Sequence, residues 1–223
     1  MDLPAVKRRR IRLEFGGSDI TSGAGAHLLR LIDRRLGLTE QLARKLPDER
    51  ISGRCQYSLR DFLRQRIYGV ALGYEDLNDS LHMRHDPALC SAAEVAGSLA
   101  SPATLCRLEQ RSGRHEAMTM HEVLVNQFIA SHRKTPKRLI LDIDATDNPV
   151  YGEQEGRHFM RYYDSYCFLP LYVYCGKQLL VSYLRPASRS PAFHAPAVIS
   201  LLVKRLRQVW PKVQIVLRAD AGF

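Results

Sequence analysis

The chain lacks any apolar run long enough to cross a membrane. A spanning helix needs about 20 consecutive, predominantly apolar residues, and the 223 residues contain no such stretch. The basic residues 7–10 are also not followed by the apolar core that a secretory signal requires. We therefore expect no membrane partner and a cytoplasmic, nucleoid-associated protein.

The chain also lacks the cysteine patterns that build disulfide scaffolds or structural zinc sites. Its five cysteines are odd in number and scattered, without a Cys-x-x-Cys pair, which argues against both frameworks and favours free thiols. His82 and His85 lie one helical turn apart with Cys90 nearby, which makes them a possible ligand set. Ordinary surface histidines are the alternative interpretation.

Positive charge is what the chain has in excess. Its 33 Lys and Arg residues outnumber 23 Asp and Glu, giving a net charge of +10 and an isoelectric point near 9.6. Such a balance favours an anionic polymer as partner, and double-stranded DNA is the partner we expect. The alternative is a merely basic soluble protein. A hydrophobic content of 45% supplies a core.

Residues 1–22 are predicted to form a basic, flexible arm. Residues 1–15 carry a net charge of +3 and lead into a stretch rich in Ser, Thr and Gly. An arm of this composition can lie along phosphates, so Arg8, Arg9 and Arg10 are candidate DNA contacts.

Residues 23–132 show helical periodicity and are predicted to form an α-helical DNA-binding domain. Two stripes of apolar residues are expected to face its core: Ala26, Leu28, Leu29, Ile32 and Leu36 in one helix, and Leu59, Phe62, Leu63, Ile67 and Val70 in another.

Two helix starts within this region suggest a helix-turn-helix. Asp86-Pro87 and Ser101-Pro102 each read as an N-cap followed by the first helical residue, which predicts two short helices joined by a tight turn. The second helix of such a motif enters the major groove, and this makes Thr104, Arg107 and Arg111 candidate DNA contacts. A helical hairpin without DNA is the alternative.

The pattern changes from helical to extended after the basic segment 132–138. Residues 138–223 are predicted to form strands at 139–144, 167–175, 179–184 and 213–217, with a helix over 195–209. The order β-β-β-α-β matches the first part of a ribonuclease H-like fold. The predicted fold class is therefore α+β or α/β, with the helical domain followed by a partial ribonuclease H-like core.

Two aspartates at the ends of predicted strands are the strongest functional signal. Asp144 closes the first strand and Asp220 follows the last, and a crossover connection would make them neighbours. Carboxylates held in this way can bind a divalent metal. Asp142 shares a face with Asp144 and is the alternative first ligand. The other interpretation is that these acids only cap strands.

The chain resembles DDE-type insertion-sequence transposases, of the group whose core opens with Leu-Asp-Ile-Asp-Ala-Thr-Asp. The likeness spans most of the chain, because Ala-Ser-Pro-Ala-Thr-Leu-Cys-Arg-Leu-Glu at residues 100–109 also resembles the N-terminal DNA-binding region of the group. The segments of the core that carry it are 141–147, 151–156 (Tyr-Gly-Glu-Gln-Glu-Gly), 166–172 (Tyr-Cys-Phe-Leu-Pro-Leu-Tyr) and 217–223 (Leu-Arg-Ala-Asp-Ala-Gly-Phe).

The resemblance implies that Asp144 and Asp220 are the first two catalytic acids and metal ligands. The complete enzyme would hold two Mg²⁺ ions, with Mn²⁺ as a possible substitute, and would cleave and join DNA at transposon terminal inverted repeats, with a homo-oligomer on DNA as a possible assembly. Family members carry a third acid, a glutamate on a later helix, whereas this sequence stops at Phe223. We therefore expect the N-terminal half of a transposase, inactive by itself.

Two alternatives to that function remain open. One is a non-catalytic DNA-binding fragment that competes with intact transposase, and the other is a self-sufficient metal-dependent nuclease. Arg218 would either neutralise the acids, contact phosphate or form a structural ion pair. Three tyrosines, Tyr162, Tyr163 and Tyr166, would either stack on flipped bases or serve as core and rim aromatics.

Overall fold

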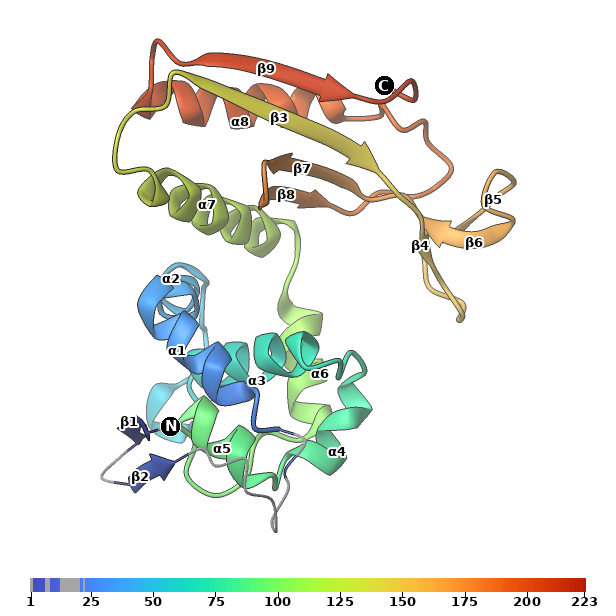
Figure 1. Cartoon of the computed structure of the whole chain (residues 1–223). Helices are drawn as coiled ribbons and strands as arrows, with labels where there is room; N and C mark the ends of the chain where they lie inside the picture. Colours follow the sequence, from blue (N-terminus) through green and yellow to red (C-terminus); the bar gives the residue numbers. More distant parts are fainter. Residues whose placement is uncertain (1, 7–8, 13–20, 22) are drawn as a thin grey trace. The chain divides into compact units, whose positions relative to one another are not determined.

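The chain divides into two compact units, which a computed structural model describes for all residues except 1, 7–8, 13–20 and 22 (Figure 1). The N-terminal unit comprises Met1–Val123 and the C-terminal unit Leu124–Phe223. The division falls within helix α7 (Arg114–Ser131), ahead of the basic segment 132–138 that marked the expected domain boundary. Val125 and Phe128 on the later part of α7 pack into the core of the C-terminal unit, and this contact places the division earlier.

The N-terminal unit is helical apart from a short hairpin. Its strands β1 (Asp2–Val6) and β2 (Arg9–Arg12) pair antiparallel within the segment expected to be a flexible arm. The helices are α1 (Ala26–Leu36), α2 (Leu38–Lys45), α3 (Leu59–Ala71), α4 (Ser80–Met83), α5 (Pro87–Ala93), α6 (Pro102–Arg111) and α7, with short 3₁₀ turns at Ser52–Arg54 and Leu77–Asp79.

Local capping chemistry explains where several of these helices begin. The Ser58 hydroxyl accepts from the Asp61 backbone N–H while the Asp61 carboxylate accepts from Ser58 N–H, a capping box that opens α3. The Asp86 side chain accepts from Leu89 N–H at 2.9 Å, and Pro87 is the first residue of α5. The starts predicted at Asp86-Pro87 and Ser101-Pro102 are thus confirmed as helix starts.

Helix α1 buries a face that differs in part from the one predicted. Leu28, Ile32 and Leu36 are each about half exposed, whereas His27, Arg30 and Asp33 are buried. The predicted apolar stripe is therefore wrong for Leu28, Ile32 and Leu36, whereas Ala26 is buried and Leu29 packs against the same buried cluster, as predicted. Polar contacts with other elements bury the charged face instead.

A buried ionic network centred on Glu94 makes this possible. The Glu94 carboxylate accepts hydrogen bonds from Arg30, Arg34 and Arg64 at 3.1, 2.7 and 2.7 Å, which ties α1 and α3 to the end of α5. Burial raises the pKa of Glu94, but the hydrogen bonds and charges of the arginines outweigh burial and bring it to about 2. The charged face is buried because its groups are paired.

Asp33 extends the network toward α2 and α3. Its carboxylate accepts from the backbone N–H and hydroxyl of Thr39 and from the Tyr68 hydroxyl, and Arg64 lies 3.6 Å away. Burial and the charge of Asp33 raise the pKa of Tyr68. Each buried acid of the network thus has several donors.

The connection between α5 and α6 is an eight-residue segment, 94–101, and not the tight turn that was predicted. Leu99 and Ala100 are buried within it. The Gln65 side chain donates to Ala100 C=O and accepts from Ala100 N–H, both at 2.9 Å, and so fixes the segment against α3. The predicted tight turn is wrong because a longer connection is stabilised by this distant amide.

The C-terminal unit is built on a mixed sheet in the order β8-β7-β3-β9. Strand β3 pairs antiparallel with β7 and parallel with β9, and β7 pairs antiparallel with β8. The elements are β3 (Arg138–Ala145), β4 (Asn148–Pro149), β5 (His158–Met160), β6 (Ser165–Phe168), β7 (Leu171–Cys175), β8 (Gln178–Tyr183), α8 (Ala195–Val209) and β9 (Gln214–Ala219).

This order contains the predicted β-β-β-α-β arrangement, with one correction. The predicted strand 167–175 is two strands, since β6 joins β4 and β5 in a separate three-stranded sheet and β7 joins the main one. Leu169 and Pro170 separate them, and Pro170 has no backbone N–H to continue a ladder. The small sheet extends beyond the end of β3 in Figure 1.

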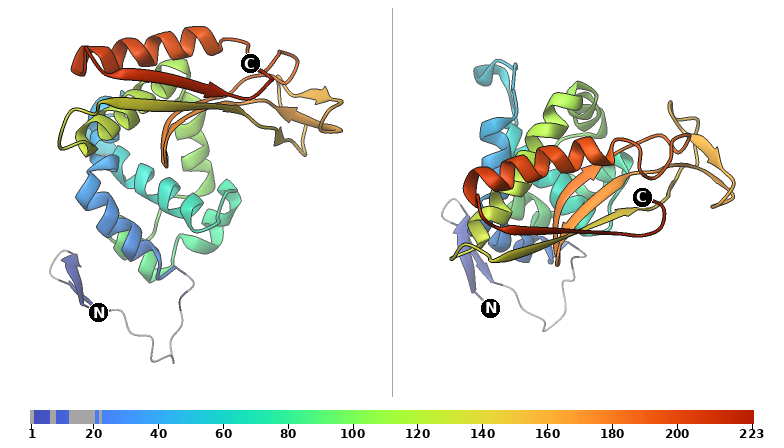
Figure 2. Two further views of the ribbon diagram at one scale, coloured as in Figure 1. Left: turned by 45° about the horizontal axis from the view of Figure 1, so that its top comes forward. Right: turned by 90° about the horizontal axis from the view of Figure 1, so that it is seen from above.

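The core of the C-terminal unit lies between its helices and the sheet. Leu139 and Leu141 of β3 pack with Leu202 and Leu206 of α8, and Phe128 of α7 joins the same cluster. Both views of Figure 2 show α8 running alongside β3 and β9. Because strand side chains alternate, the opposite face of β3 carries Ile140 and the aspartates.

No helix among the described residues is both long and apolar enough to span a membrane.

Candidate active site

The register of β3 and β9 brings the two predicted acids to the same place. The parallel pairing runs without a shift from Arg138 opposite Gln214 to Ile143 opposite Ala219. Carried one residue further, this register aligns Asp144 with Asp220, at the carboxyl end of both strands. Both aspartates are exposed.

Asp142 is held by an arginine from the neighbouring strand. It lies opposite Arg218 in the register, and the Arg218 Nε–H donates to its Oδ1. This hydrogen bond lowers the pKa of the Asp142 carboxyl. The contact gives Arg218 the role of a strand-side ion pair, one of its predicted alternatives, and it occupies an oxygen of Asp142. Among the two strand-one acids, the geometry favours Asp144 as a metal ligand.

Asp220 sits in a turn that fixes its carboxylate. Its Oδ1 accepts the Gly222 N–H at 3.0 Å. A Cβ added at Gly222 would lie 3.1 Å from that oxygen and 3.5 Å from Pro191. Phe223 packs against the cluster of Ile143, Leu171 and Ala195 and holds the far end of the turn. The hydrogen bond from Gly222 N–H to Oδ1 agrees with the strand-capping interpretation of Asp220. The same turn also orients the carboxylate.

Arg185 fixes the segment 191–193 next to this turn and was missed in the sequence. Its side chain is 2% exposed, and its guanidinium donates to Leu169 C=O at 2.9 Å, to Pro191 C=O at 2.6 Å and to Phe193 C=O at 2.7 Å. Burial lowers its pKa. The contact with Pro191 links Arg185 to the residue that packs beside Gly222. The sequence signal that could have indicated Arg185 is its position just after an apolar strand.

The tyrosines of the small sheet have different surroundings. Tyr162 is 83% exposed, whereas Tyr163 packs against the buried cluster of Cys167, Leu169 and Ala187. Burial raises the pKa of Tyr163, and the charges of Asp147 and then Asp144 add to the shift. Tyr163 is therefore a core aromatic close to the aspartates.

Tyr166 lies at the rim of the small sheet. It is half exposed, and the Arg157 guanidinium lies 4.6 Å from its ring centroid. Phe159 packs edge-on against the same ring at 5.4 Å. These contacts match the rim-aromatic interpretation.

The donor chemistry at the strand ends suits a hard divalent cation. Asp144 and Asp220 offer carboxylate oxygens, the ligands that Mg²⁺ prefers. Within the described part of the chain, no group of three or more His, Cys, Asp and Glu side chains is gathered for a metal. The two aspartates therefore fit such an ion as part of a ligand set.

The same observation removes the alternative ligand set of His82, His85 and Cys90. Both histidines are exposed, as the surface interpretation predicted. The Cys90 thiol is buried and donates to Arg84 C=O at 3.4 Å. Burial raises its pKa, which disfavours the thiolate that a metal needs.

The predicted DNA contacts near the start of the chain are only partly described. Arg8 lies outside the described residues, and only the backbone of Arg9 is described, in β2. The Arg10 side chain is exposed on the same strand. Of these three arginines, Arg10 is the one whose side chain the structure describes.

The predicted contacts on α6 differ among themselves. Arg107 is exposed. Thr104 is half-buried, and its hydroxyl is hydrogen-bonded to that of Ser101 at 3.0 Å, so it serves the helix start. Arg111 lines a cavity of about 600 Å³ between α2, α3, α6 and the start of α7. Arg111 is exposed as well as lining this cavity, and Arg107 is the candidate for which the described residues show no such role.

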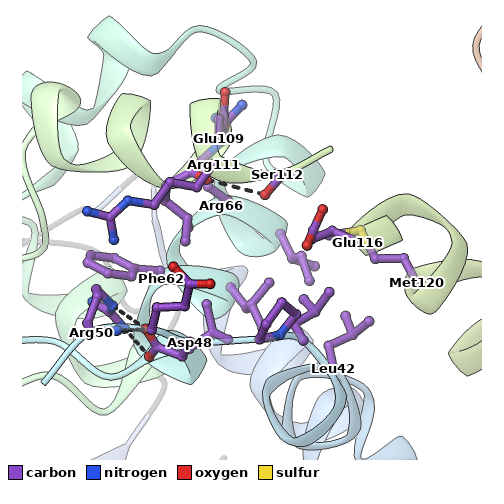
Figure 3. Close-up of a pocket in the computed structure, with 17 residues that line it drawn as sticks. Leu42, Asp48, Arg50, Phe62, Arg66, Glu109, Arg111, Ser112, Glu116 and Met120 are labelled. Atoms are coloured by element: carbon purple, nitrogen blue, oxygen red, sulfur yellow. Dashed lines mark hydrogen bonds and ion pairs between the residues drawn. The ribbon is translucent and has the colours of Figure 1, made fainter. Parts of the chain in front are cut away.

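Arg111 faces acids inside that cavity (Figure 3). Arg50 forms hydrogen bonds to both oxygens of Asp48, drawn as dashed lines in the figure. These lower the pKa of Asp48, and the charge of Arg111 adds a smaller effect. Part of the Arg111 charge is thus balanced within the protein.

The fold and the paired strand ends together define a class. A mixed sheet that aligns carboxylates at the ends of two adjoining parallel strands is consistent with a ribonuclease H-like DDE domain. The chain belongs to the family described as Transposase DDE domain group 1, whose match covers residues 3–223. Membership implies DNA as substrate and a divalent metal, typically Mg²⁺. No curated protein and no solved structure matches the chain.

Proposed function

We propose that this chain supplies Asp144 and Asp220 as two metal ligands of an insertion-sequence transposase that cleaves DNA and transfers the strand. The observation that supports the proposal is the unbroken parallel register of β3 and β9, which ends at Ile143 opposite Ala219, one residue before Asp144 and Asp220. Family membership supplies the reaction class. Terminal inverted repeats are the DNA sites proposed for it.

The chain's own residues prepare the site for a cation. Asp144 is held in β3 opposite Tyr172, and Asp220 directly follows the last residue of β9, so each would present carboxylate oxygen near a strand end. Arg218 pairs with Asp142 and so balances the charge of the third carboxylate on this face. The Gly222 N–H orients Asp220. When bound, Mg²⁺ activates the attacking hydroxyl and stabilises the leaving oxygen.

The 223-residue chain is proposed to be inactive by itself. Two carboxylates provide less charge than a two-metal site needs, and the described residues gather no larger acidic group. A further carboxylate from elsewhere would complete the ligand set. The chain would then act as a DNA-binding part of the transposase, and as a competitor of intact enzyme when alone.

A metal-binding measurement tests the assignment of the two acids. Mn²⁺ titrated into the chain and followed by electron paramagnetic resonance should bind weakly, and Asp144→Asn or Asp220→Asn should each reduce the affinity by about tenfold or more. Asp142→Asn is the matched control, because it removes a charge from the same strand. Equal losses of Mn²⁺ affinity in all three variants would mean that net charge alone explains the effect. A loss of affinity in Asp142→Asn alone would make Asp142, and not Asp144, the ligand.

DNA binding by the N-terminal unit is the second part of the proposal. The net charge of +10 supports it, together with the exposed side chains of Arg10 and Arg107. Duplex DNA should bind the chain without metal, with an affinity that falls as salt rises. Binding that stays constant across a salt titration, or that is absent at low salt, would contradict this part.

A further inference from the structure

Arg185 joins the two segments of the C-terminal unit that support the candidate acids. Its Nε–H donates to Leu169 C=O at 2.9 Å, and its Nη1 donates to Pro191 C=O at 2.6 Å and to Phe193 C=O at 2.7 Å. The Leu169 N–H in turn donates to Arg185 C=O at 2.8 Å. One side chain therefore connects the link between β6 and β7 with the segment that precedes α8.

The contact with Leu169 leads to Asp144. In the ladder of β3 and β7, Leu171 pairs with Ala145 and Tyr172 pairs with Asp144. Ala145 also packs against the buried cluster that contains Leu169. A movement of Leu169 would therefore be passed to the end of β3, where Asp144 lies.

The contact with Pro191 leads to Asp220. Pro191 lies beside Gly222, because a Cβ added at Gly222 would be 3.5 Å from the Pro191 ring. The Gly222 N–H donates to Asp220 Oδ1 at 3.0 Å. Figures 1 and 2 both show the start of α8 next to the end of β9. The segment 191–193 therefore supports the turn that orients the Asp220 carboxylate.

The charge of Arg185 is unusual for a residue in this position. Its side chain is 2% exposed, and among the described residues its hydrogen bonds go to backbone carbonyls and not to a carboxylate. Its Nη2 is buried without a hydrogen-bond partner in the same part of the chain. Burial lowers its pKa, because a cation without a counter-charge is unfavourable there. A neutral donor would avoid this cost, but only a guanidinium holds several acceptors in the fixed geometry of a planar fork.

We propose that Arg185 is a positioning residue that sets the separation of Asp144 and Asp220, and with it the preference of the site for a small divalent cation. The inference rests on the proposed function of these two acids. Mg²⁺ demands near-ideal octahedral geometry with short ligand distances, whereas Ca²⁺ accepts longer and more variable ones. A fixed separation therefore favours Mg²⁺, and a looser one weakens that preference.

Metal competition in the 223-residue chain tests the proposal. Bound Mn²⁺ is followed by electron paramagnetic resonance while Mg²⁺ or Ca²⁺ is added as competitor. Arg185→Met keeps an unbranched side chain and removes the fork, so Mg²⁺ affinity should fall by about tenfold and Ca²⁺ affinity much less. Loss of a positive charge alone would instead strengthen the binding of both cations. An unchanged ratio of Mg²⁺ to Ca²⁺ affinity, or tighter binding of both cations, would overturn the proposal.

Two other arginines of the same unit provide matched controls. Arg189→Met removes an exposed charge close to Arg185 in the chain. Arg207→Met removes a guanidinium that also donates to two backbone carbonyls, those of Pro211 and Val213, near the other end of α8. Both variants should keep the parent ratio of Mg²⁺ to Ca²⁺ affinity. An equal fall of the ratio in Arg185→Met and in either control would refute the role of the fork.

Arg185→Lys is the conservative variant. It keeps the charge but replaces the planar fork with a point charge on a flexible stem. Its ratio of Mg²⁺ to Ca²⁺ affinity should therefore fall as well, and a ratio equal to that of the parent would show that charge alone is required. If Arg185→Met does not fold, Arg185→Lys decides.

A metal-free measurement separates this inference from the proposed function. In the ¹H–¹⁵N spectrum of the labelled chain, the Gly222 amide reports its hydrogen bond to Asp220. Arg185→Lys should shift this resonance, whereas Arg207→Met should not. If the parent chain binds no Mn²⁺, the proposed metal site fails, and a shifted Gly222 amide still supports the positioning role. A Gly222 amide unchanged in Arg185→Lys would overturn that role.

Discussion

Asp142 and Asp144 are equivalent by strand alternation, and only the neighbouring strand distinguishes them. Arg218 lies opposite Asp142 and binds it, whereas the residue aligned with Asp144 is Asp220. A carboxylate next to an arginine is neutralised, while two adjacent carboxylates repel each other unless a cation binds between them. The proposal that Asp144, and not Asp142, is the metal ligand therefore rests on the residue opposite each acid.

The glycine after Asp220 offers a residue-scale test of the turn. Gly222→Ala would place a Cβ 3.1 Å from Asp220 Oδ1 and 3.5 Å from Pro191, so the carboxylate must move. We expect Mn²⁺ affinity to fall by about tenfold with little change in melting temperature. Gly53→Ala is the control, since its Cβ would meet nothing within 4 Å. Unchanged Mn²⁺ affinity in Gly222→Ala would show that the turn does not position Asp220.

At the scale of elements, polar contacts determine how α1, α3 and α5 pack. Glu94 ends α5 in a left-handed conformation, with a φ of 64°, and its carboxylate meets arginines from α1 and α3. Such a network is specific in geometry, because removing one partner leaves the others buried and unpaired. The helices are therefore aligned by ion pairs as well as by apolar contact.

Replacing Glu94 should destabilise the N-terminal unit strongly. Glu94→Gln leaves the buried Arg30 without its counter-charge and Arg64 with the more distant Asp33 as its acid, and we expect a loss of about 3 kcal/mol in the free energy of unfolding. Glu122→Gln removes an exposed pair with Lys45 and should cost less than about 1 kcal/mol. Urea unfolding monitored by circular dichroism measures both. A loss in Glu94→Gln no larger than that in Glu122→Gln would contradict the role of the network.

The lowered pKa of Glu94 also predicts that the stability of the fold depends on pH in the acidic range. The folded pKa of Glu94 is about 2, below its ordinary value of 4.5, so its ionised form is the one that folding stabilises. Its contribution is present above pH 4.5 and is lost as the pH falls toward 2. Unfolding measured across this range should show a steeper loss of stability in the parent than in Glu94→Gln. If stability fell in parallel with pH in the parent and in Glu94→Gln, the lowered pKa of Glu94 would be contradicted.

At the scale of the whole molecule, the two units divide the proposed labour. The N-terminal unit holds Arg10 and Arg107, the exposed arginines proposed to contact DNA, and the C-terminal unit holds Asp144 and Asp220. Each unit has its own buried clusters. DNA binding and metal binding should therefore be separable by mutation.

A cleavage assay on the 223-residue chain gives the test of catalysis. With Mg²⁺ or Mn²⁺, the 223-residue chain should neither nick nor join DNA, because its aspartates make an incomplete two-metal site. A supercoiled plasmid assay would detect cleavage. Metal-dependent nicking that disappears in Asp220→Asn would refute the incomplete-site proposal and favour the self-sufficient nuclease.

Short-range patterns in the sequence determined much of this protein. Alternation and apolar content predicted β3, β9 and the crossover helix α8, and Asp86-Pro87 predicted the start of α5. These features depend on neighbouring residues, so they can be read locally.

Only the tertiary structure decided which faces are buried and which acids meet. Arg30 and Glu94 are 64 residues apart, and their contact turns the charged side of α1 inward. Arg218 and Asp142 are 76 residues apart, and their contact distinguishes Asp142 from Asp144. Local periodicity carries no information about such partners, because a buried charge is tolerated only where the rest of the chain supplies its counter-charge.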